Sequence, residues 1–396
     1  MSRDPFPPFT FLHSTPRIVF GWDSVDRLGE IAREFGAGSA VIVLDSVFRD
    51  GPLEARLEAS LTPALADPPT VFAVPRHEPD TASVAACHRF LAAADADMIV
   101  AVGGGSALDT AKVARMLLAN PGDVAAIAGI GTPMKPHCSH LLCVPTTAGT
   151  GSEVSESAVI SDKAAGTKLI YRAPEMSAHV ALLDPALTVT APARVTACSG
   201  YDAITHAVEA YVSRMASPMT DPLALSALRL LAAGLPAACS TPTDRAARSA
   251  CLIGACQAAI AFNSANLGLA HALSAPLGAL HGIAHGLGNA LALPAVTAYN
   301  EPRLGDKGAA IAAILDAPTP SEGLSRLRHT VGLDHGLDEF VTTEAERERL
   351  AQAALKSGQV KMNPRRADID HMRAIIDAMR APTGGARPRI APEIAP

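Results

Sequence analysis

Residues 98–118 read MIVAVGGGSALDTAKVARMLL, and this stretch places a strand, a glycine turn and a helix directly after one another. The uninterrupted apolar run 98–102 predicts a buried strand, and the apolar spacing over 106–118 predicts a helix. Three glycines at such a junction let the backbone approach a ligand closely, and Ser106 is expected to cap the helix, whose free amides attract anions. The stretch therefore predicts a phosphate-binding turn; the alternative is a tight turn that happens to need glycine.

The rest of the first half of the chain repeats this alternation of apolar runs and helical patterns. Further buried strands are predicted at residues 39–44, 70–74, 141–144 and 180–183. Helices are predicted at 24–34 and 80–94, and a small hairpin at 152–160 and 167–171. Continuous apolar strands that alternate with helices are typical of a parallel sheet with helices on both faces. Ligands bind such sheets at the carboxyl ends of the strands.

The pattern of apolar residues in the sequence changes between Asp184 and Pro192. After this interval the strand-like runs stop, and Ala- and Leu-rich helical patterns continue almost to the end of the chain. The 396 residues exceed the size at which single cores stop growing, about 250–300 residues. We therefore predict an α/β nucleotide-binding domain over residues 1–188 and an all-helical domain over 189–396. The Pro- and Gly-rich tail from about residue 381 is predicted to be loose.

Composition argues against several classes of protein. Apolar residues make up 48% of the chain and charged residues 18%, and the net charge of −6 comes without a cluster of Lys or Arg, which argues against nucleic acid as a partner. The seven cysteines form no CxxC pair and are odd in number, so we expect reduced thiols in a cytoplasmic protein. The sequence shows neither a signal-peptide pattern nor an apolar run of about 18 residues, so no membrane span is expected.

A second loop, rich in hydroxyl groups and glycine, follows the predicted strand at 141–144. It reads PTTAGTGSE over residues 145–153 and offers hydrogen bonds to a pyrophosphate or a nicotinamide ribose, although an ordinary Ser/Thr turn has a similar sequence. The usual G-x-G-x-x-G fingerprint after the first strand is absent. Asp45 ends that strand, where an acid could bind an adenosine ribose and repel a 2′-phosphate. Local sequence alone favours a helix N-cap or loop role for Asp45.

The segment CSGYDAITHAVEAYVS at 198–213 is predicted to be a helix that carries Asp202 and His206. Residues four apart lie on one helix face, one turn from each other, so this carboxylate and imidazole can share one metal ion. His271 and His285 lie in a second apolar region downstream. One carboxylate with three imidazoles suits Fe²⁺ or Zn²⁺ and leaves positions open for a substrate oxygen. The alternative for each histidine is a core residue with a satisfied hydrogen bond.

Five segments form a recognisable series along the chain. They are GGGSALDTAK at 103–112, PTTAGTGSEVS at 145–155, LLDPALT at 182–188, GYDAITHAVEAY at 200–211 and GLAHALSAPLGALHGIAHGLGNALALP at 268–294. In this order and spacing they resemble the iron-containing (group III) alcohol dehydrogenase family, over most of the chain. The resemblance implies an α/β dinucleotide-binding domain with a parallel sheet flanked by helices, followed by an all-α domain, an architecture shared with dehydroquinate synthase. The active site would lie in the cleft between the domains.

The resemblance also implies roles for individual residues. The metal ligands would be Asp202, His206, His271 and His285, holding Fe²⁺ or alternatively Zn²⁺. A nicotinamide cofactor would lie on residues drawn from both loops and their flanks: Asp45, Gly103, Gly104, Gly105, Ser106, Asp109, Thr146, Thr147, Ser152 and Lys168. Asp45 falls where the family often reads the adenosine ribose, which favours NAD over NADP.

One position departs from the family pattern. Family members commonly carry a histidine four residues after the third ligand, associated with proton transfer near the nicotinamide, and this chain has Ala275 there. His281, four residues before His285, is one substitute as a catalytic proton carrier. The alternative is that His281 only lines the pocket or supports His285.

The implied activity is hydride transfer between nicotinamide C4 and a small alcohol, aldehyde or ketone held by the metal, in a homodimer. The nearest alternative is a maleylacetate reductase, which uses the same fold on an oxo-acid but typically lacks the complete metal set. A cyclase or lyase of the dehydroquinate synthase type is disfavoured because residues 198–294 hold only four arginines for a phosphorylated substrate. A protein that binds NAD without catalysis is disfavoured by the complete ligand set.

Overall fold

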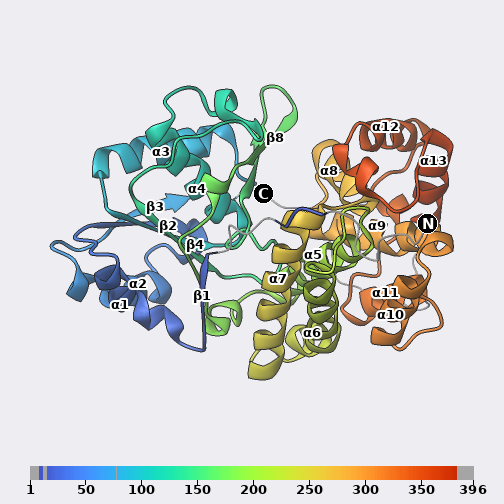
Figure 1. Ribbon diagram of the computed structural model, residues 1–396, viewed down its shortest axis with the longest axis horizontal. Helices are drawn as coiled ribbons and strands as arrows, with labels where there is room; N and C mark the ends of the chain where they lie inside the picture. The colour runs from blue at the N-terminus through green and yellow to red at the C-terminus, as the bar shows by residue number, and fades with distance from the viewer. Residues whose placement is uncertain (1–8, 12–15, 77, 381–396) are drawn as a thin grey trace, which may run out of the picture.

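The computed structural model describes residues 9–11, 16–76 and 78–380. Figure 1 shows an α/β part built from the first half of the chain beside a helical part built from the second half. This is the fold class that the sequence predicts. The tail that we expect to be loose lies outside the described residues.

Six parallel strands form the central sheet, in the order β1-β9-β6-β4-β2-β3. They are β1 (Arg17–Phe20), β2 (Ala40–Asp45), β3 (Thr70–Val74), β4 (Met98–Gly103), β6 (His140–Pro145) and β9 (Val180–Leu183). Successive side chains point to opposite faces, so Ile99 joins one apolar core whereas Val100 and Val102 join the other. In the inner strands β2, β4, β6 and β9 both faces are buried, which explains why their sequences are almost continuously apolar.

Helices and short 3-10 turns connect these strands. In chain order they are η1 (Ser24–Arg27), α1 (Leu28–Glu34), η2 (Ser46–Phe48), α2 (Pro52–Leu61), η3 (Thr62–Ala64), α3 (Thr81–Ala94), α4 (Gly105–Ala119), η4 (Val124–Ile127), η5 (Pro174–Met176) and η6 (Pro185–Thr188). The N-cap of α4 is Gly104, and no side chain in the described part of the chain caps this helix. The prediction that Ser106 caps it is therefore wrong, because Ser106 lies inside the first turn.

A separate three-stranded sheet carries the hairpin that the sequence predicts. Its strands are β5 (Gly129–Ile130), β7 (Ser157–Asp162) and β8 (Thr167–Arg172). Strands β7 and β8 pair in antiparallel register. The first strand begins at Ser157 rather than at Ser152, because residues 151–156 form turns instead of extended backbone.

The second half of the chain is helical, and among the described residues no strand follows Leu183. Its elements are α5 (Ala193–Val212), α6 (Asp221–Ser240), α7 (Arg245–Ala265), α8 (Leu269–His281), α9 (His285–Asn300), η7 (Glu301–Arg303), α10 (Asp306–Ile314), α11 (Pro320–Thr330), η8 (Leu337–Glu339), α12 (Glu344–Leu355), η9 (Gly358–Met362) and α13 (Ile369–Ala378). Small residues let these helices pack closely: a Cβ at Gly254 would lie 2.8 Å from Leu231 Cγ. A domain boundary after residue 188 stays a prediction, although it falls between the last strand and α5.

Helix α6 is long and apolar enough to cross a membrane, judged by length and composition alone. The pair α7 and α8 passes the same test only as one span bent by 103°. In the fold, α6 packs against α5 and α7, and its Leu228, Leu231 and Leu235 lie in the core of the helical part. Because a buried core helix passes this test as well, the finding is weak evidence for a membrane span.

The two parts of the molecule share a small apolar cluster. Val154 and Leu183 from the α/β part pack with Leu252 and Ala259 of α7. Gly151 has φ of 65°, and a Cβ at this position would overlap the Cβ of Ala259. The loop that follows β6 is therefore pressed directly onto the helical part.

Candidate metal and cofactor site

Helix α5 presents three ionisable side chains on one buried face. Asp202, His206 and Glu209 follow one another at spacings of four and three residues, so they lie along a single helix face. Their exposed fractions are 3%, 4% and 3%. Buried groups of this kind need polar partners, and α8 and α9 provide them.

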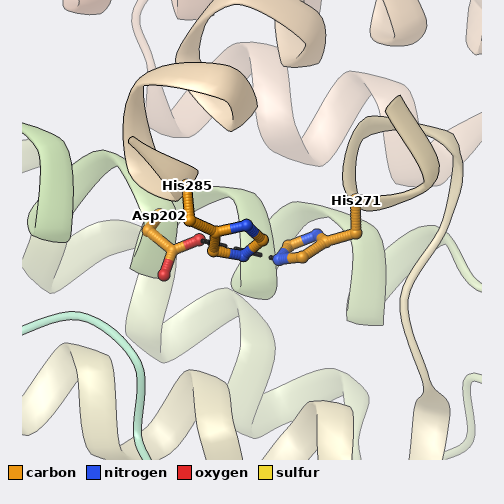
Figure 2. Close-up of side chains that lie close together, drawn as sticks. All are labelled: Asp202, His271 and His285. Atoms are coloured by element: carbon orange, nitrogen blue, oxygen red, sulfur yellow. Dashed lines mark ion pairs between the residues drawn. The ribbon is translucent and has the colours of Figure 1, made fainter. Parts of the chain in front are cut away.

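Helices α8 and α9 bring two histidines to Asp202. His271 Nε2 lies 3.6 Å from Asp202 Oδ1, and His285 Nε2 lies 3.7 Å from the same oxygen. Figure 2 shows the three side chains pointing toward one another from separate segments. One ligand atom from each lies within 4.8 Å of the other two, a spacing that could hold a metal ion. The structure thus brings together three of the four predicted ligands.

The fourth predicted ligand, His206, lies beside this group of three. Its Nε2 is 3.7 Å from Asp202 Oδ1, and its ring stacks on that of His271 with centroids 4.8 Å apart. It is not part of the set whose atoms all lie within 4.8 Å of one another. Its Nδ1 is buried and finds no hydrogen-bond partner within the described ranges. His206 is therefore adjacent to the group, and its ligand role stays a prediction.

Asn289 lies at the centre of the group, one turn after His285 on α9. It was not identified from the sequence as a site residue. Its Nδ2 donates to Asp202 Oδ1 at 2.6 Å and lies 3.0 Å from His271 Nε2 and 3.3 Å from His285 Nε2. All three ligand atoms therefore converge on the NH₂ group of one amide, whose hydrogens carry partial positive charge. A carboxylate with imidazoles is a donor set that Fe²⁺ and Zn²⁺ accept at about 2.0–2.2 Å. The residues fit such an ion, provided that the Asn289 side chain rotates aside.

The same proximity shifts the pKa values of these groups. Burial lowers the pKa of His206 to about 4 and also lowers the pKa of His285. Burial acts on His271 too, but hydrogen bonds with Asp202 and Glu209 outweigh it and raise the pKa of His271 to about 9. Burial opposes ionisation of Asp202, yet the three histidines hold the pKa of this carboxyl below its usual range. Asp202 is therefore ionised, and two of the imidazoles are neutral, which is the form that binds metal.

The glycine turn lies at the carboxyl end of β4, against the end of β2. Gly103 has φ of 152°, and a Cβ there would lie 2.8 Å from the Cβ of Asp45 and 2.7 Å from that of Ala107. A Cβ at Gly105 would lie 2.8 Å from Thr150 Cγ2 in the second loop. Side chains at these two positions would fill the space in which the loops and Asp45 meet.

The start of the second loop joins the same surface. Thr146 donates its backbone N–H to Gly103 O at 2.9 Å. The Thr147 hydroxyl lies 3.7 Å from the position that a Cβ at Gly104 would take. Ser106 lies next to them in the first turn of α4. The structure brings these predicted cofactor residues together at the carboxyl ends of neighbouring strands, where ligands of such sheets bind.

Two further predicted cofactor residues, Asp109 and Ser152, bind one another beneath this surface. Ser152 Oγ donates to Asp109 Oδ1 at 2.5 Å. Lys112, which the sequence reasoning missed, is 1% exposed and donates to the backbone oxygens of Ser152, Ser155 and Ser157 at 2.9, 2.8 and 2.5 Å. Burial raises the pKa of Asp109 and lowers that of Lys112, while each charge favours the ionised form of the other. This pair therefore anchors the second loop.

Glu153 in this loop gives a pH-dependent prediction. Burial raises the pKa of Glu153 to about 7. A hydrogen bond from its own backbone amide and the charge of Lys112 lower the pKa, but by less than burial raises it. The folded-state pKa exceeds the unfolded value of 4.5. Protonated Glu153 therefore contributes its full share to the free energy of unfolding below pH 4.5, and this contribution is lost as the pH rises to 7. At 1.36 kcal/mol per pKa unit the loss is about 3 kcal/mol. Glu153→Gln, neutral throughout, should gain that much stability relative to wild type between pH 4.5 and 8, measured by urea unfolding. A pH-independent difference would contradict the prediction.

Lys168 of β8 lies near enough to His285 for its charge to act on that side chain. Its Nζ forms an ion pair with Glu78 at 3.2 Å. Burial is the main cause of the lowered pKa of His285, and the positive charge of Lys168 adds to it. Lys168 is therefore within electrostatic reach of a predicted ligand, although it comes from the α/β part.

His281, the predicted proton carrier, ends α8 on the side of α12. Ten residues separate it from His271 along the helix, which corresponds to about 15 Å at 1.5 Å per residue. Glu346 of α12 has its pKa lowered mainly by the backbone amide of Thr343, with His281 as a smaller contribution. His281 Nε2 is buried without a hydrogen-bond partner in the part of the chain that the structure describes. The structure does not bring His281 into the three-residue group.

Comparison with known proteins assigns both parts of the chain to one family. Residues 15–185 match the model for iron-containing alcohol dehydrogenases, and residues 196–380 match the C-terminal model of the same family. The probable alcohol dehydrogenase EutG of Escherichia coli (strain K12) is 35% identical over 362 residues, covering 90% of this chain and 91% of that protein. The NAD-dependent methanol dehydrogenase of Bacillus methanolicus is 31% identical over 374 residues, covering 91% and 97%.

Solved structures give the same result. The crystal structure of a 1,3-propanediol oxidoreductase superposes with a TM-score of 0.89 and 31% identity, covering 94% of this chain and 100% of that chain. A maleylacetate reductase from Agrobacterium tumefaciens is also similar, with a TM-score of 0.81, 25% identity and coverage of 94% and 98%. The chain therefore belongs to the iron-containing alcohol dehydrogenase family, whose members are oxidoreductases that act on CH–OH groups.

Proposed function

We propose that this protein is a metal-dependent, NAD(H)-linked alcohol dehydrogenase that also reduces small aldehydes or ketones. The observation that carries the proposal is the convergence of Asp202, His271 and His285 on one point, marked by Asn289 Nδ2. We assign His206 as a fourth ligand. The family supports Fe²⁺ as the ion, and Zn²⁺ is the alternative that the same donors accept.

A bound divalent cation would supply Lewis-acid polarisation of the carbonyl oxygen, and a bound nicotinamide would supply or accept the hydride. The chain itself supplies position and electrostatics. Ionised Asp202 and neutral His285 offer lone pairs from a site closed to bulk water on the α5 side. The second loop is fixed against α5, because a Cβ at Gly149 would lie 2.9 Å from Ser199 O. Holding the cofactor loop and the ligand helix in one arrangement would keep a bound cofactor and substrate in a fixed relative orientation, which favours hydride transfer.

Asp45 supports NAD(H) over NADP(H), and its replacement gives a prediction. Its Oδ1 accepts the backbone N–H of Val47 at 3.1 Å, so the local capping role is real, but Oδ2 is not used in that bond. The carboxylate lies beside Gly103, where it would repel a 2′-phosphate. Two charges about 4 Å apart near a protein surface interact by roughly 1–4 kcal/mol. Asp45→Ala should therefore lower the NADH/NADPH ratio of kcat/KM about tenfold or more, and an unchanged ratio would contradict this role.

The proton path is the part of the proposal with three candidate carriers. Ala275 cannot carry a proton, and His281 stands at the far end of α8 from His271. We propose that water would carry the proton to the product oxygen, with ribose hydroxyls of a bound cofactor as a second route and His281 as the alternative carrier. Lys168 contributes a positive charge on this side of the site.

We further propose a cytoplasmic homodimer that acts on small alcohols and aldehydes, without nucleic-acid or membrane partners. All seven cysteines are free thiols, as in proteins of reducing compartments. The low share of aromatic residues, 4%, favours a compact aliphatic or oxygenated substrate.

One experiment tests the function. The purified protein is stripped of metal, reloaded with Fe²⁺ or Zn²⁺, and assayed for NADH oxidation with aldehydes, hydroxy acids, diols and maleylacetate. We expect activity toward small aldehydes that requires the metal. Metal-independent reduction of maleylacetate would favour the alternative, a maleylacetate reductase. The structural similarity to an enzyme of that kind supports this alternative. Failure to bind any divalent metal would overturn the proposal.

A further inference from the structure

Glu209 is a buried carboxylate on α5 that neither the metal group nor the cofactor loops use directly. Its Oε2 lies 2.6 Å from His271 Nδ1, and its Oε1 accepts the backbone N–H of Ala270 at 2.7 Å. The Ala270 amide belongs to the first turn of α8, where backbone N–H groups have no partner inside the helix. Glu209 thus joins α5 to the start of α8 through the ring of a predicted ligand.

The hydrogen bonds around the His271 ring determine which nitrogen carries the proton. Asn289 Nδ2 lies 3.0 Å from His271 Nε2, and the reverse amide orientation would place an oxygen 2.6 Å from Asp202 Oδ1. In the neutral ring, the form that binds a cation, the amide therefore donates to Nε2, which holds a lone pair. In the neutral ring the proton then resides on Nδ1, and a carboxylate is the acceptor that this proton meets.

We infer that Glu209 is a positioning residue of the metal centre, which fixes the tautomer of His271 and makes its Nε2 a better donor to a cation. This inference rests on the proposed function, because it assigns a role within the same site. A carboxylate on the far nitrogen of a ligand histidine orients the ring and raises its basicity. The effect is specific to His271, since Ser274 is the partner of His285 Nδ1 at 3.0 Å.

Gly268 is an independent sign that the Glu209 carboxylate is held in place. A Cβ at Gly268 would lie 2.9 Å from Glu209 Oε1 and 3.2 Å from Asn363 Oδ1. The backbone of Gly268 has φ of −123°, outside the left-handed region, so the close approach of the carboxylate is a reason of its own for glycine at this position. Any larger residue would push Glu209 away from His271.

Glu209→Gln is the most informative substitution because it keeps the shape and removes the charge. If the amide oxygen accepts from Ala270, the NH₂ group faces His271 Nδ1 and forces the ring proton onto Nε2. If the oxygen instead accepts from His271, the NH₂ group opposes the Ala270 N–H. Either arrangement leaves His271 a poorer ligand or a buried donor unpaired.

The experiment measures Co²⁺ and Zn²⁺ dissociation constants of metal-stripped protein by chelator competition, together with the visible absorption spectrum of the Co²⁺ form. For Glu209→Gln we expect dissociation constants about 10–100-fold higher than wild type and an altered Co²⁺ spectrum. The matched control is Glu54→Gln. Glu54 is 6% exposed and likewise accepts one side-chain donor, Arg49 Nη1, and one backbone amide, Asp50 N, each at 2.7 Å. This control should lose stability without losing metal affinity.

Unchanged metal affinity and an unchanged Co²⁺ spectrum in Glu209→Gln would overturn the inference while leaving the proposed function intact. Failure of wild type to bind metal would instead overturn the proposed function. If Glu209→Gln does not fold, Gly268→Ala takes its place, since it keeps every ligand and the charge but displaces the carboxylate. Gly268→Ala should also weaken metal binding, and wild-type affinity in this variant would overturn the inference.

Discussion

Replacing Asp202 by asparagine should leave a folded protein that has lost its metal and at least about three powers of ten in kcat/KM. The carboxylate lies within 3.7 Å of a nitrogen from His206, His271 and His285, so it is the one negative charge that all three imidazoles face. Lewis-acid stabilisation is worth several kcal/mol, and each 1.36 kcal/mol is a factor of ten. Metal content per chain and NADH oxidation after reconstitution are the measurements.

Asp184→Asn is the matched control for this substitution. Asp184 is fully buried at the end of β9, outside the metal group, and accepts backbone N–H groups from Asp23, Val25 and Ala186 at 3.0, 3.1 and 3.0 Å. This control should lower the melting temperature and keep the metal. Full metal content together with wild-type activity in Asp202→Asn would contradict the proposed ligand set.

Replacing Lys112 by methionine should lower the free energy of unfolding by about 3–5 kcal/mol, the range for removing one partner of a buried charge pair. Methionine has a similar length but donates no hydrogen bond, so the carbonyls of Ser152, Ser155 and Ser157 lose their shared donor. Asp109 would remain buried without its countercharge. We also expect the KM for NAD(H) to rise about tenfold, equivalent to 1.4 kcal/mol, because the second loop loses its anchor.

Lys163→Met separates this effect from the loss of any lysine near the loop. Lys163 lies in the turn of the neighbouring hairpin, its side chain is 66% exposed, and it pairs with Asp80 at 2.7 Å. Asp80 is 6% exposed but keeps its two hydrogen bonds from Ser83, so this variant should lose less stability than Lys112→Met does. If Lys112→Met is equally mild, the carbonyl cluster does not depend on a buried cation. Chemical denaturation and NADH titration measure both effects.

The sequence predicted elements whose cause is local. The strand at 98–102 and the helix after it were found because apolar periodicity and glycine act within a few residues. The helix start was misjudged by one residue, since Gly104 rather than a serine hydroxyl precedes it. The edge strand β1 at Arg17–Phe20 was missed because its apolar run covers only residues 18–20, shorter than the roughly four to eight residues that indicate a buried strand.

The candidate site was predicted only where one helix or a family motif supplied the pattern. Asp202 and His206 follow from helical spacing, whereas the approach of His271 and His285 needs the packing of α8 and α9 on α5. The local sequence gives no sign that Lys112 is buried, and only carbonyls some forty residues away surround its ammonium group. Spacing on the same helices offered a signal that was not used: three residues after His206 comes Glu209, and four after His285 comes Asn289.

The apolar cluster shared by the two parts bears on how the molecule can be taken apart. Leu252 and Ala259 of α7 cover Val154 and Leu183, and Gly151 packs directly on Ala259. Separation of the two parts would therefore expose these apolar side chains to water. A fragment that ends near residue 188 would carry an open apolar face and a loop whose shape depends on the missing helix. Calorimetry of the intact chain should therefore record one cooperative transition, and truncation at this junction should give aggregation instead of two independent folding units.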